Sequence, residues 1–263
     1  MEIVLLILAG VVVYYLYITL QEYLKNPIAV ESKKNIKPVV EEYDLSKDPY
    51  VQISPLDKLK KTEFGLMTMI ISKINVDKKT SLQNTLIEGL FEDMQVQMQG
   101  VENAKESLFE IYKQQDDSDL EGLCKGLLQA TYGEYKKRLK FIEFLFGFAY
   151  GDGKLESEEK ENIIDIAAFL ELSNEDFNKI YDDFEAQNAK EIKISYDEAL
   201  GLFDLQGEFK EEDLDLKFKN LIIECKQNIF DVKNLNKSFV LCFEKMREID
   251  FAYQILLGAK KEQ

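Results

Sequence analysis

The prolines of this chain constrain its fold most, because all four lie near its beginning. They are Pro27, Pro38, Pro49 and Pro55. A proline removes a backbone donor and its ring clashes with the preceding helical turn, so residues 56–263, which contain none, can form uninterrupted helices. Apolar side chains recur there at helical spacing, as in Phe141, Phe144, Leu145 and Phe148. The sequence therefore predicts an all-α body joined by glycine and Asn/Asp turns.

Composition excludes several classes of function. There is no histidine, which removes the commonest general base, the imidazole metal ligand and any Ser-His-Asp or Cys-His hydrolase site. A formal net charge of −16 opposes nucleic-acid binding. Three cysteines, Cys124, Cys225 and Cys242, lie far apart without CxxC spacing, which favours free thiols in a reducing compartment. With no glycine-rich phosphate loop either, we expect a non-enzymatic protein.

The run IVLLILAGVVVYYLYITL, residues 3–20, is long enough to span a membrane. It contains no charged residue, and at about 1.5 Å per residue it makes a helix of roughly 27 Å. Glu2 precedes the run where a cleaved signal peptide would have a basic start. Aromatic residues typical of a membrane interface gather at its far end, namely Tyr14, Tyr15, Tyr17 and Tyr23. We predict an uncleaved anchor at residues 1–25.

The flanking charges predict the orientation of this anchor. Four lysines follow it closely, Lys25, Lys33, Lys34 and Lys37, so the amino end should lie outside and the bulk of the chain in the cytoplasm. Residues 26–56, which hold the prolines, are predicted to be a linker. Self-association through the anchor stays open, since Gly10 alone makes no GxxxG face.

Two segments of the body share one pattern. Residues 64–91, FGLMTMIISKINVDKKTSLQNTLIEGLF, and residues 142–170, IEFLFGFAYGDGKLESEEKENIIDIAAFL, each contain an apolar helix, an Asp-centred turn and a second apolar helix. Asp77 and Asp152 occupy equivalent places in the two turns. We therefore expect paired helical hairpins that pack on each other.

The Asp152-Gly153 turn does not fit a calcium loop of the EF-hand type. With Gly153 in the sixth position, Phe148 and Tyr150 would fall where oxygen ligands are required. The acids of residues 156–161 are instead typical of the first turn of the following helix.

The same region resembles a known family. Residues 138–181, RLKFIEFLFGFAYGDGKLESEEKENIIDIAAFLELSNEDFNKIY, look like the tellurite-resistance TerB fold, and residues 63–94 look like its weaker internal repeat. The resemblance implies a TerB-like helical bundle over residues 57–188. It also implies acidic turn residues that bind a divalent cation in some relatives, and Asp152 and Glu159 stand at the matching positions.

The carboxyl end predicts three more helices. They are a short one over residues 196–200, one over residues 211–225 and a last one over residues 238–257. The apolar faces of the last two complement each other, which predicts an antiparallel helical pair. The facing residues are Leu214, Phe218, Leu221, Ile222 and Cys225 against Phe239, Phe243, Met246, Ile249 and Tyr253.

This end resembles a J-domain, a helical hairpin domain, over residues 195–263. The marks are the Y-x-x-x-L-G start at Tyr196, the FKNLIIE helix and the closing KMREIDFAYQIL helix. An anchor, a TerB-like domain and a J-like domain in that order are similar to the DjlA-like family of membrane co-chaperones. That resemblance implies a single-pass protein of the bacterial inner membrane.

The residues on which J-domain activity depends are missing. The family stimulates DnaK-type ATPases through a His-Pro-Asp tripeptide after its second helix, and here that position holds Lys226, Gln227 and Asn228. The family also uses a basic face on that helix. Here Lys217 and Lys219 are its basic residues, but acids outnumber lysines four to three over residues 213–231, which gives little attraction for an acidic partner.

Three functional hypotheses follow. The first is a membrane-tethered, non-enzymatic, chaperone-like adaptor or scaffold without a cofactor, which binds protein partners at the cytoplasmic face of the membrane. Its partner is a membrane complex or a DnaK-type chaperone, whose ATPase it does not stimulate. The second is an active J-domain co-chaperone. The third is a TerB-like sensor of a divalent cation that uses Asp152 and Glu159.

Overall fold

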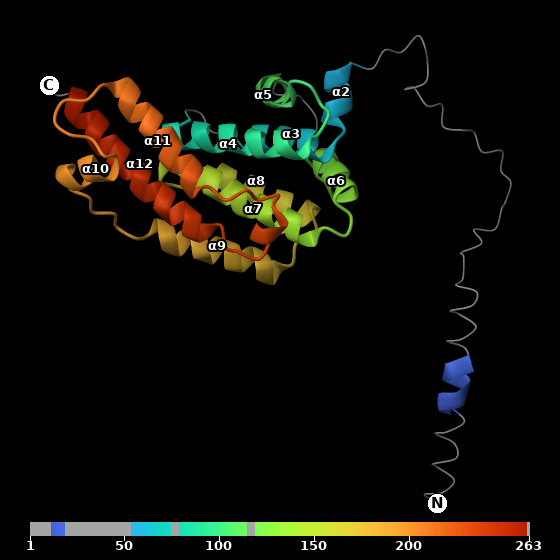
Figure 1. Ribbon diagram of the computed structural model, residues 1–263. Coiled ribbons are helices and arrows are strands. Elements are labelled where there is room, and N and C mark those ends of the chain that lie inside the picture. The colour runs from blue at the N-terminus through green and yellow to red at the C-terminus, as the bar shows by residue number, and fades with distance from the viewer. Residues whose placement is uncertain (1–11, 19–53, 75–78, 115–118, 262–263) are drawn as a thin grey trace, which may run out of the picture. The chain divides into compact units, whose positions relative to one another are not determined.

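The computed structural model describes residues 12–18, 54–74, 79–114 and 119–261, and within these ranges every regular element is a helix. The prediction of an all-α fold is thus confirmed for the described part of the chain. Residues 1–53 and residues 54–263 are separate units, and all the labelled helices of Figure 1 belong to the second.

Most of the predicted membrane anchor lies outside the described residues. Within it, residues 12–18 are helical, and Tyr14, Tyr15 and Tyr17 are exposed there. The rest of the anchor, including Tyr23, and the linker up to residue 53 are not described. Where the structure is described, no helix combines the length and the apolar character needed to cross a bilayer.

The body begins with five helices, most of which start after a capping residue. They are α2 (Pro55–Lys60), α3 (Glu63–Ser72), α4 (Ser81–Gln97), α5 (Ala104–Gln114) and α6 (Leu120–Ala130). Four of them follow a residue whose side-chain oxygen accepts a backbone N–H of the first turn, namely Ser54, Thr62, Thr80 and Asp119. Pro55 falls inside the predicted linker, yet it opens α2, because the first helical position needs no backbone donor.

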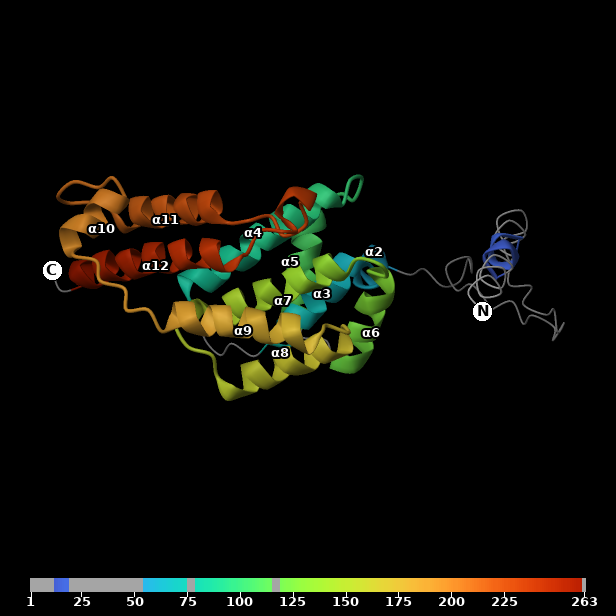
Figure 2. The same ribbon diagram turned by 90° about the horizontal axis from the view of Figure 1, so that it is seen from below.

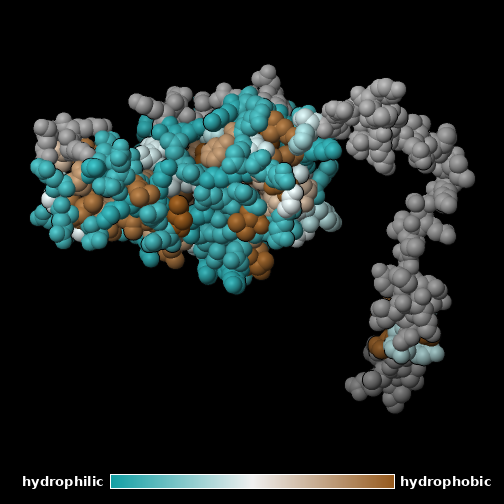
Figure 3. All heavy atoms as spheres, turned by 45° about the horizontal axis from the view of Figure 1, so that its top comes forward, coloured by the Kyte–Doolittle hydropathy of each residue, from teal (hydrophilic) through white to brown (hydrophobic). Residues whose placement is uncertain are grey.

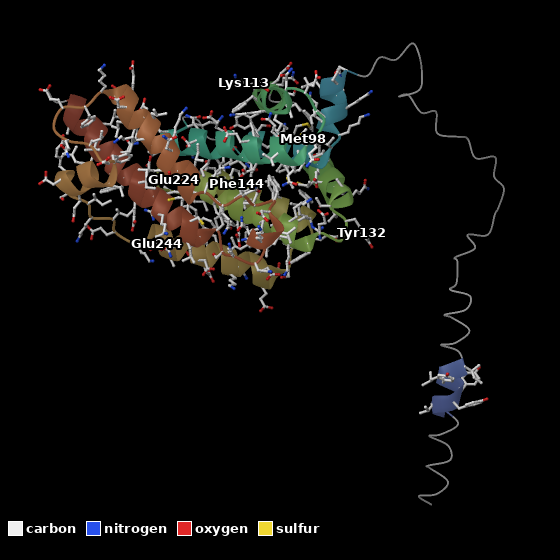
Figure 4. The ribbon with its side chains drawn as sticks, in the orientation of Figure 1. Met98, Lys113, Tyr132, Phe144, Glu224 and Glu244 are labelled. Carbon is white, nitrogen blue, oxygen red and sulfur yellow. The ribbon has the colours of Figure 1, made fainter. Side chains whose placement is uncertain are left out.

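Helix α7 (Tyr135–Ala149) is the central element of the body. Every residue from Lys140 to Tyr150 is buried, and Phe144 lies near the middle of the body, residues 54–263, in Figure 4. A helix that is buried all round needs neighbours on every side. The short helix η2 (Tyr150–Asp152), then α8 (Ser157–Phe169) and α9 (Asn174–Asn188) follow it, and α8 and α9 both pack against it.

The two predicted hairpin segments meet at their turns. The Thr80 hydroxyl donates a hydrogen bond to the Gly151 carbonyl (3.2 Å), and Gln83 Nε2 donates to the Phe148 carbonyl (3.0 Å). Gln83 is completely buried there, so its amide satisfies a carbonyl at the end of α7. Asp77 of the first turn lies outside the described residues.

The carboxyl end forms the three predicted helices, close to their predicted bounds. They are α10 (Tyr196–Leu202), α11 (Glu211–Cys225) and α12 (Val240–Lys261), with a short helix η3 (Val232–Asn234) before the last. Tyr253 Oη donates to Asp215 Oδ1 (2.7 Å), and the Tyr253 and Phe218 ring centroids are 4.4 Å apart. The start of α11 thus lies against the end of α12, as the antiparallel prediction requires.

The carboxyl-terminal helices pack on the earlier ones and share their core. Helix α12 contacts α4, α7 and α9, and α11 contacts α4. Figures 1 and 2 show α10, α11 and α12 together at one end of the body and α2 and α6 at the other. The face in Figure 3 is mostly hydrophilic with separate apolar spots.

Candidate partner-binding site

Lys226, at the predicted tripeptide position, is bound to another part of the same chain. It ends α11, and its Nζ donates to Asp93 Oδ1 (2.6 Å) and to the Gly89 carbonyl (2.8 Å), both on α4. Each side chain of the Lys226–Asp93 pair is only 14% exposed. A Cβ added to Gly89 would come within 2.9 Å of Lys226 Cδ, so this glycine provides the space for the lysine stem. The ammonium is therefore engaged within the chain.

Burial also affects the partner carboxylate. Removal from water raises the pKa of Asp93 above its ordinary value, while the hydrogen bond and the charge of Lys226 oppose that rise. The aspartate therefore depends on the lysine for its charged form.

Asn228 begins a turn that runs to Asp231. Asn228 Oδ1 accepts from the Phe230 amide (2.9 Å), and the Asn228 carbonyl accepts from Asn234 Nδ2 (3.0 Å). Gln227 Oε1 is buried and has no hydrogen-bond partner among the described residues. The turn brings the Phe230 ring to within 5.2 Å of the Phe64 ring on α3, measured between centroids. The predicted tripeptide position is thus held against the rest of the body.

Lys217 and Lys219, the predicted docking residues, also contact other parts of the chain. Lys217 Nζ donates to the carbonyls of Phe203 (2.9 Å) and Asp204 (2.6 Å), which follow the end of α10. Lys219 Nζ lies 3.4 Å from Glu88 on α4, and its side chain is 52% exposed. Whether either residue binds a partner stays a prediction.

A buried ion pair on α7 makes hydrogen bonds to the backbone just before α12. Lys140 Nζ donates to Glu143 Oε2 (2.6 Å) and to the Lys237 carbonyl, and the lysine side chain is only 2% exposed. Glu143 Oε2 also accepts from the Phe239 amide (3.1 Å), where the first amides of α12 have no partner within the helix. The Phe239 ring reaches α7 at Gly147, where a Cβ would come within 2.6 Å of it.

The turn at Asp152 and Glu159 has only part of what a metal site needs. Glu159 is buried, and its Oε2 accepts from the Glu156 amide (3.1 Å). Burial raises the pKa of Glu159 to about 7, the hydrogen bond from Glu156 opposes the rise, and the charges of Asp152 and Glu156 add to it. Asp152 is exposed and its Oδ1 accepts from the Lys154 amide (3.1 Å). Over the described ranges, no three or more acidic or cysteine side chains converge as metal ligands.

A cleft of about 620 Å³ lies between the end of α9, the connection that follows it, α10 and α12. Its volume is within the range of ligand sites in proteins. Apolar, acidic and basic side chains line it, and Glu244 on α12 lies beside the connection between α9 and α10 in Figure 4. Arg247 Nη1 donates to the Gln187 carbonyl (2.6 Å) at the end of α9. The cleft contains none of the partner-binding or metal-binding residues predicted from the sequence.

Comparison with protein-family models matches residues 64–182 to the family described as tellurite resistance protein TerB. Residues 64–182 form a TerB domain. The range begins in α3 and ends in α9, so it confirms the predicted TerB resemblance and leaves α10, α11 and α12 outside it. A search of curated proteins and a search of solved structures found no match. The J-like assignment of residues 195–263 stays a prediction.

The contacts of Lys226 and Phe239 join the TerB domain to the segment that follows it. Asp93, Lys140 and Glu143 belong to the TerB domain, while Lys226 and Phe239 belong to the segment beyond it. All the residues that line the cleft, from Gln187 onward, lie beyond the matched range. The residues of greatest structural consequence therefore lie along the contact between the TerB domain and the carboxyl-terminal helices.

The sequence predictions did not include the TerB side of this contact. The pair Lys140 and Glu143 could have been predicted from the sequence. Two charged residues three apart within the apolar helix RLKFIEFLFGFA indicate a buried ion pair. No sequence pattern distinguishes Asp93, since it stands beside Glu92 on a helix with other acids. Arg247 and Gln187 lie 60 residues apart, and no local pattern connects them.

Proposed function

We propose that this protein is a non-enzymatic adaptor or scaffold, and that its carboxyl-terminal helices do not stimulate a DnaK-type ATPase. The observation that supports this most directly is the position of Lys226. Where a J-domain would present its tripeptide, this chain has a lysine bound to Asp93 and to the Gly89 carbonyl. A group that is already paired and only 14% exposed is a poor contact for a second protein.

The helix before this position supports the same proposal. Over residues 213–231, four acids oppose three lysines. The structure shows Lys217, Lys219 and Lys226 in contacts with α10 and α4. Little positive charge is left on α11 to attract an acidic chaperone.

The proposal includes a membrane tether at residues 1–25, with the body at the cytoplasmic face of a bacterial inner membrane. The uncharged run of residues 3–20 and the lysines that follow it support this part. Tyr14, Tyr15 and Tyr17 are exposed on the described helical segment, as residues of a membrane interface would be. The protein partner would then be a component of, or a visitor to, that membrane.

The ATPase activity of a DnaK-type chaperone tests the proposal. We expect the full-length chain to leave the steady-state rate at the level of the chaperone alone, because no residue after Pro55 is a histidine or a proline. A J-domain protein with an intact tripeptide serves as the positive control. Stimulation by the full-length chain equal to that control would show that the proposal is wrong.

A variant makes this test sharper. Lys226→His, Gln227→Pro and Asn228→Asp together restore the tripeptide, and stimulation by this variant alone would locate the loss of activity in these three positions. Lys226→Met is the matched control, because it also removes the partner of Asp93 but restores no tripeptide. Circular dichroism confirms that both variants remain helical.

A further inference from the structure

The connection between α9 and α10 has no regular secondary structure, but its side chains alternate in burial as those of a strand do. Residues 191–195 belong to no helix, and the backbone runs from one helix to the next in Figure 2. Along it, Glu191 and Lys193 are exposed, whereas Ile192 and Ile194 are half-buried. This alternation has the two-residue period of a strand with one face on the protein.

The backbone of this segment is open. None of the N–H and C=O groups of residues 191–194 makes a hydrogen bond to another residue that the structure describes. The next amide, that of Ser195, donates to Glu198 Oε2 (2.8 Å) and begins the cap of α10. Unpaired backbone N–H and C=O groups are available to pair with an added strand.

The cleft beside this segment has apolar residues in its lining. Its apolar lining consists of Ile192 and Ile194 from the segment and Leu202 from α10. Leu202 is 42% exposed, so it is available for contact. A strand that paired with residues 191–194 would place alternate side chains against these three.

The charged groups of the cleft decide which partner fits. Its cations are already engaged: Lys190 pairs with Glu244 (2.8 Å), Lys193 with Glu191 (2.9 Å), and Arg247 Nη1 with the Gln187 carbonyl. Among the described residues, Glu248 has no partner. Gln187 Oε1 is buried without a donor. The unmet groups are thus acceptors, and a ligand should supply donors and positive charge.

We propose that the 191–194 segment and its cleft bind an extended basic peptide of a partner protein by strand addition. The proposal deepens the adaptor function by naming the chemistry of the partner, and it rests on that function. Backbone hydrogen bonds to residues 191–194 supply affinity, and contacts of lysine or arginine with Glu248 supply selectivity. The net charge of −16 of the whole chain favours the approach of such a partner.

Fluorescence anisotropy with a labelled probe peptide tests the proposal on the full-length chain. The probe is an octapeptide in which valine and lysine alternate. One comparison peptide has glutamate in place of each lysine, and another is N-methylated at every backbone amide, which removes its donors. We expect binding of the lysine peptide, and at least about tenfold weaker binding of both comparison peptides.

Two charge reversals provide matched variants. Glu248→Lys changes the cleft, and we expect it to weaken binding of the lysine peptide at least about fivefold. Glu106→Lys makes the same change in net charge on α5, at an exposed residue without a partner among those described, and we expect less than about a twofold effect.

Each contrary outcome has a definite meaning. Equal binding of the lysine and glutamate peptides, or an equal effect of Glu248→Lys and Glu106→Lys, would overturn the cleft as a basic-peptide site. Equal binding of the N-methylated peptide would overturn strand addition. Any of these results would leave the ATPase measurement as it stands, so a failure of this proposal is distinguishable from a failure of the adaptor function.

Discussion

At the scale of single residues, Lys226 and Asp93 form the contact with the largest expected consequence. Both side chains are largely buried, and they join positions 133 residues apart in the sequence. The mutual attraction of a buried pair offsets the cost of removing two charges from water. Removal of one partner leaves the other as an unpaired buried charge, and that is where the energetic penalty lies.

Lys226→Met should therefore destabilise the chain. We expect a loss of about 2–3 kcal/mol in the free energy of unfolding, measured by urea denaturation of the full-length protein. Lys219→Met on the same helix is the control, because its ion pair with Glu88 is exposed and should contribute less than about 0.5 kcal/mol. Equal effects of the two substitutions would contradict the role assigned to the buried pair.

Glu159 predicts how stability depends on pH. Because burial raises the pKa of Glu159 to about 7 in the folded state, the folded chain binds a proton more tightly than the unfolded chain does. Its contribution to stability is therefore greatest at low pH and is lost as the pH rises toward that value. Glu159→Gln keeps an acceptor for the Glu156 amide and removes this titration.

We expect the loss of stability between pH 5 and pH 8 to be smaller in Glu159→Gln than in the wild type by about 1–2 kcal/mol. Urea midpoints at the two pH values measure it. Glu158→Gln, at the exposed neighbouring position, should follow the wild type. If both variants follow the wild type, the carboxyl of Glu159 titrates as an ordinary exposed group.

At the scale of elements, α7 decides how α12 packs. Its apolar residues are buried on all sides, its Lys140–Glu143 pair receives the backbone before α12, and Gly147 leaves space for the Phe239 ring. The segment just before α12 is therefore held on α7 by both polar and apolar contacts. A helix start held in this way has one position on its neighbour.

Gly147→Ala tests this packing. The added Cβ would come within 2.6 Å of the Phe239 ring, so we expect a loss of about 1–3 kcal/mol in the free energy of unfolding. Gly258→Ala in α12 is the control, since nothing lies within 4 Å of its added Cβ and alanine is the better helix former. Thermal or urea denaturation should show effects of opposite sign, and a neutral Gly147→Ala would mean that the ring moves freely.

At the scale of the whole molecule, residues 54–263 are one unit although only residues 64–182 match the TerB family. The carboxyl-terminal segment buries Phe239 and Phe243, and the ring centroid of Phe239 lies 6.3 Å from that of Phe144 in the TerB domain. Deletion of these helices would expose that apolar surface. Point substitutions are for this reason the better test of the adaptor function and of the peptide cleft.

Much of the fold could be predicted from local patterns. The three carboxyl-terminal helices lie within a few residues of their predicted bounds, because Ser195 caps α10 and apolar spacing marks α11 and α12. Helix α12 is described as far as Lys261, beyond its predicted end at residue 257. In the candidate site, the sequence predicts that Lys226 stands where a J-domain has its tripeptide. It does not show that Lys226 contacts Asp93 and Gly89.

Local interactions explain why the fold class and most helix positions can be predicted from the sequence. Helix periodicity, caps and the absence of proline act over a few residues, so the all-α class and most helix positions follow from the chain itself. Other features involve residues far apart in sequence. They are the Lys226–Asp93 contact, the hydrogen bond from the Phe239 amide to Glu143, and the cleft beside residues 191–194. Only packing determines which buried groups become neighbours, and packing places Lys226, at the position of the missing tripeptide, against Asp93 and Gly89.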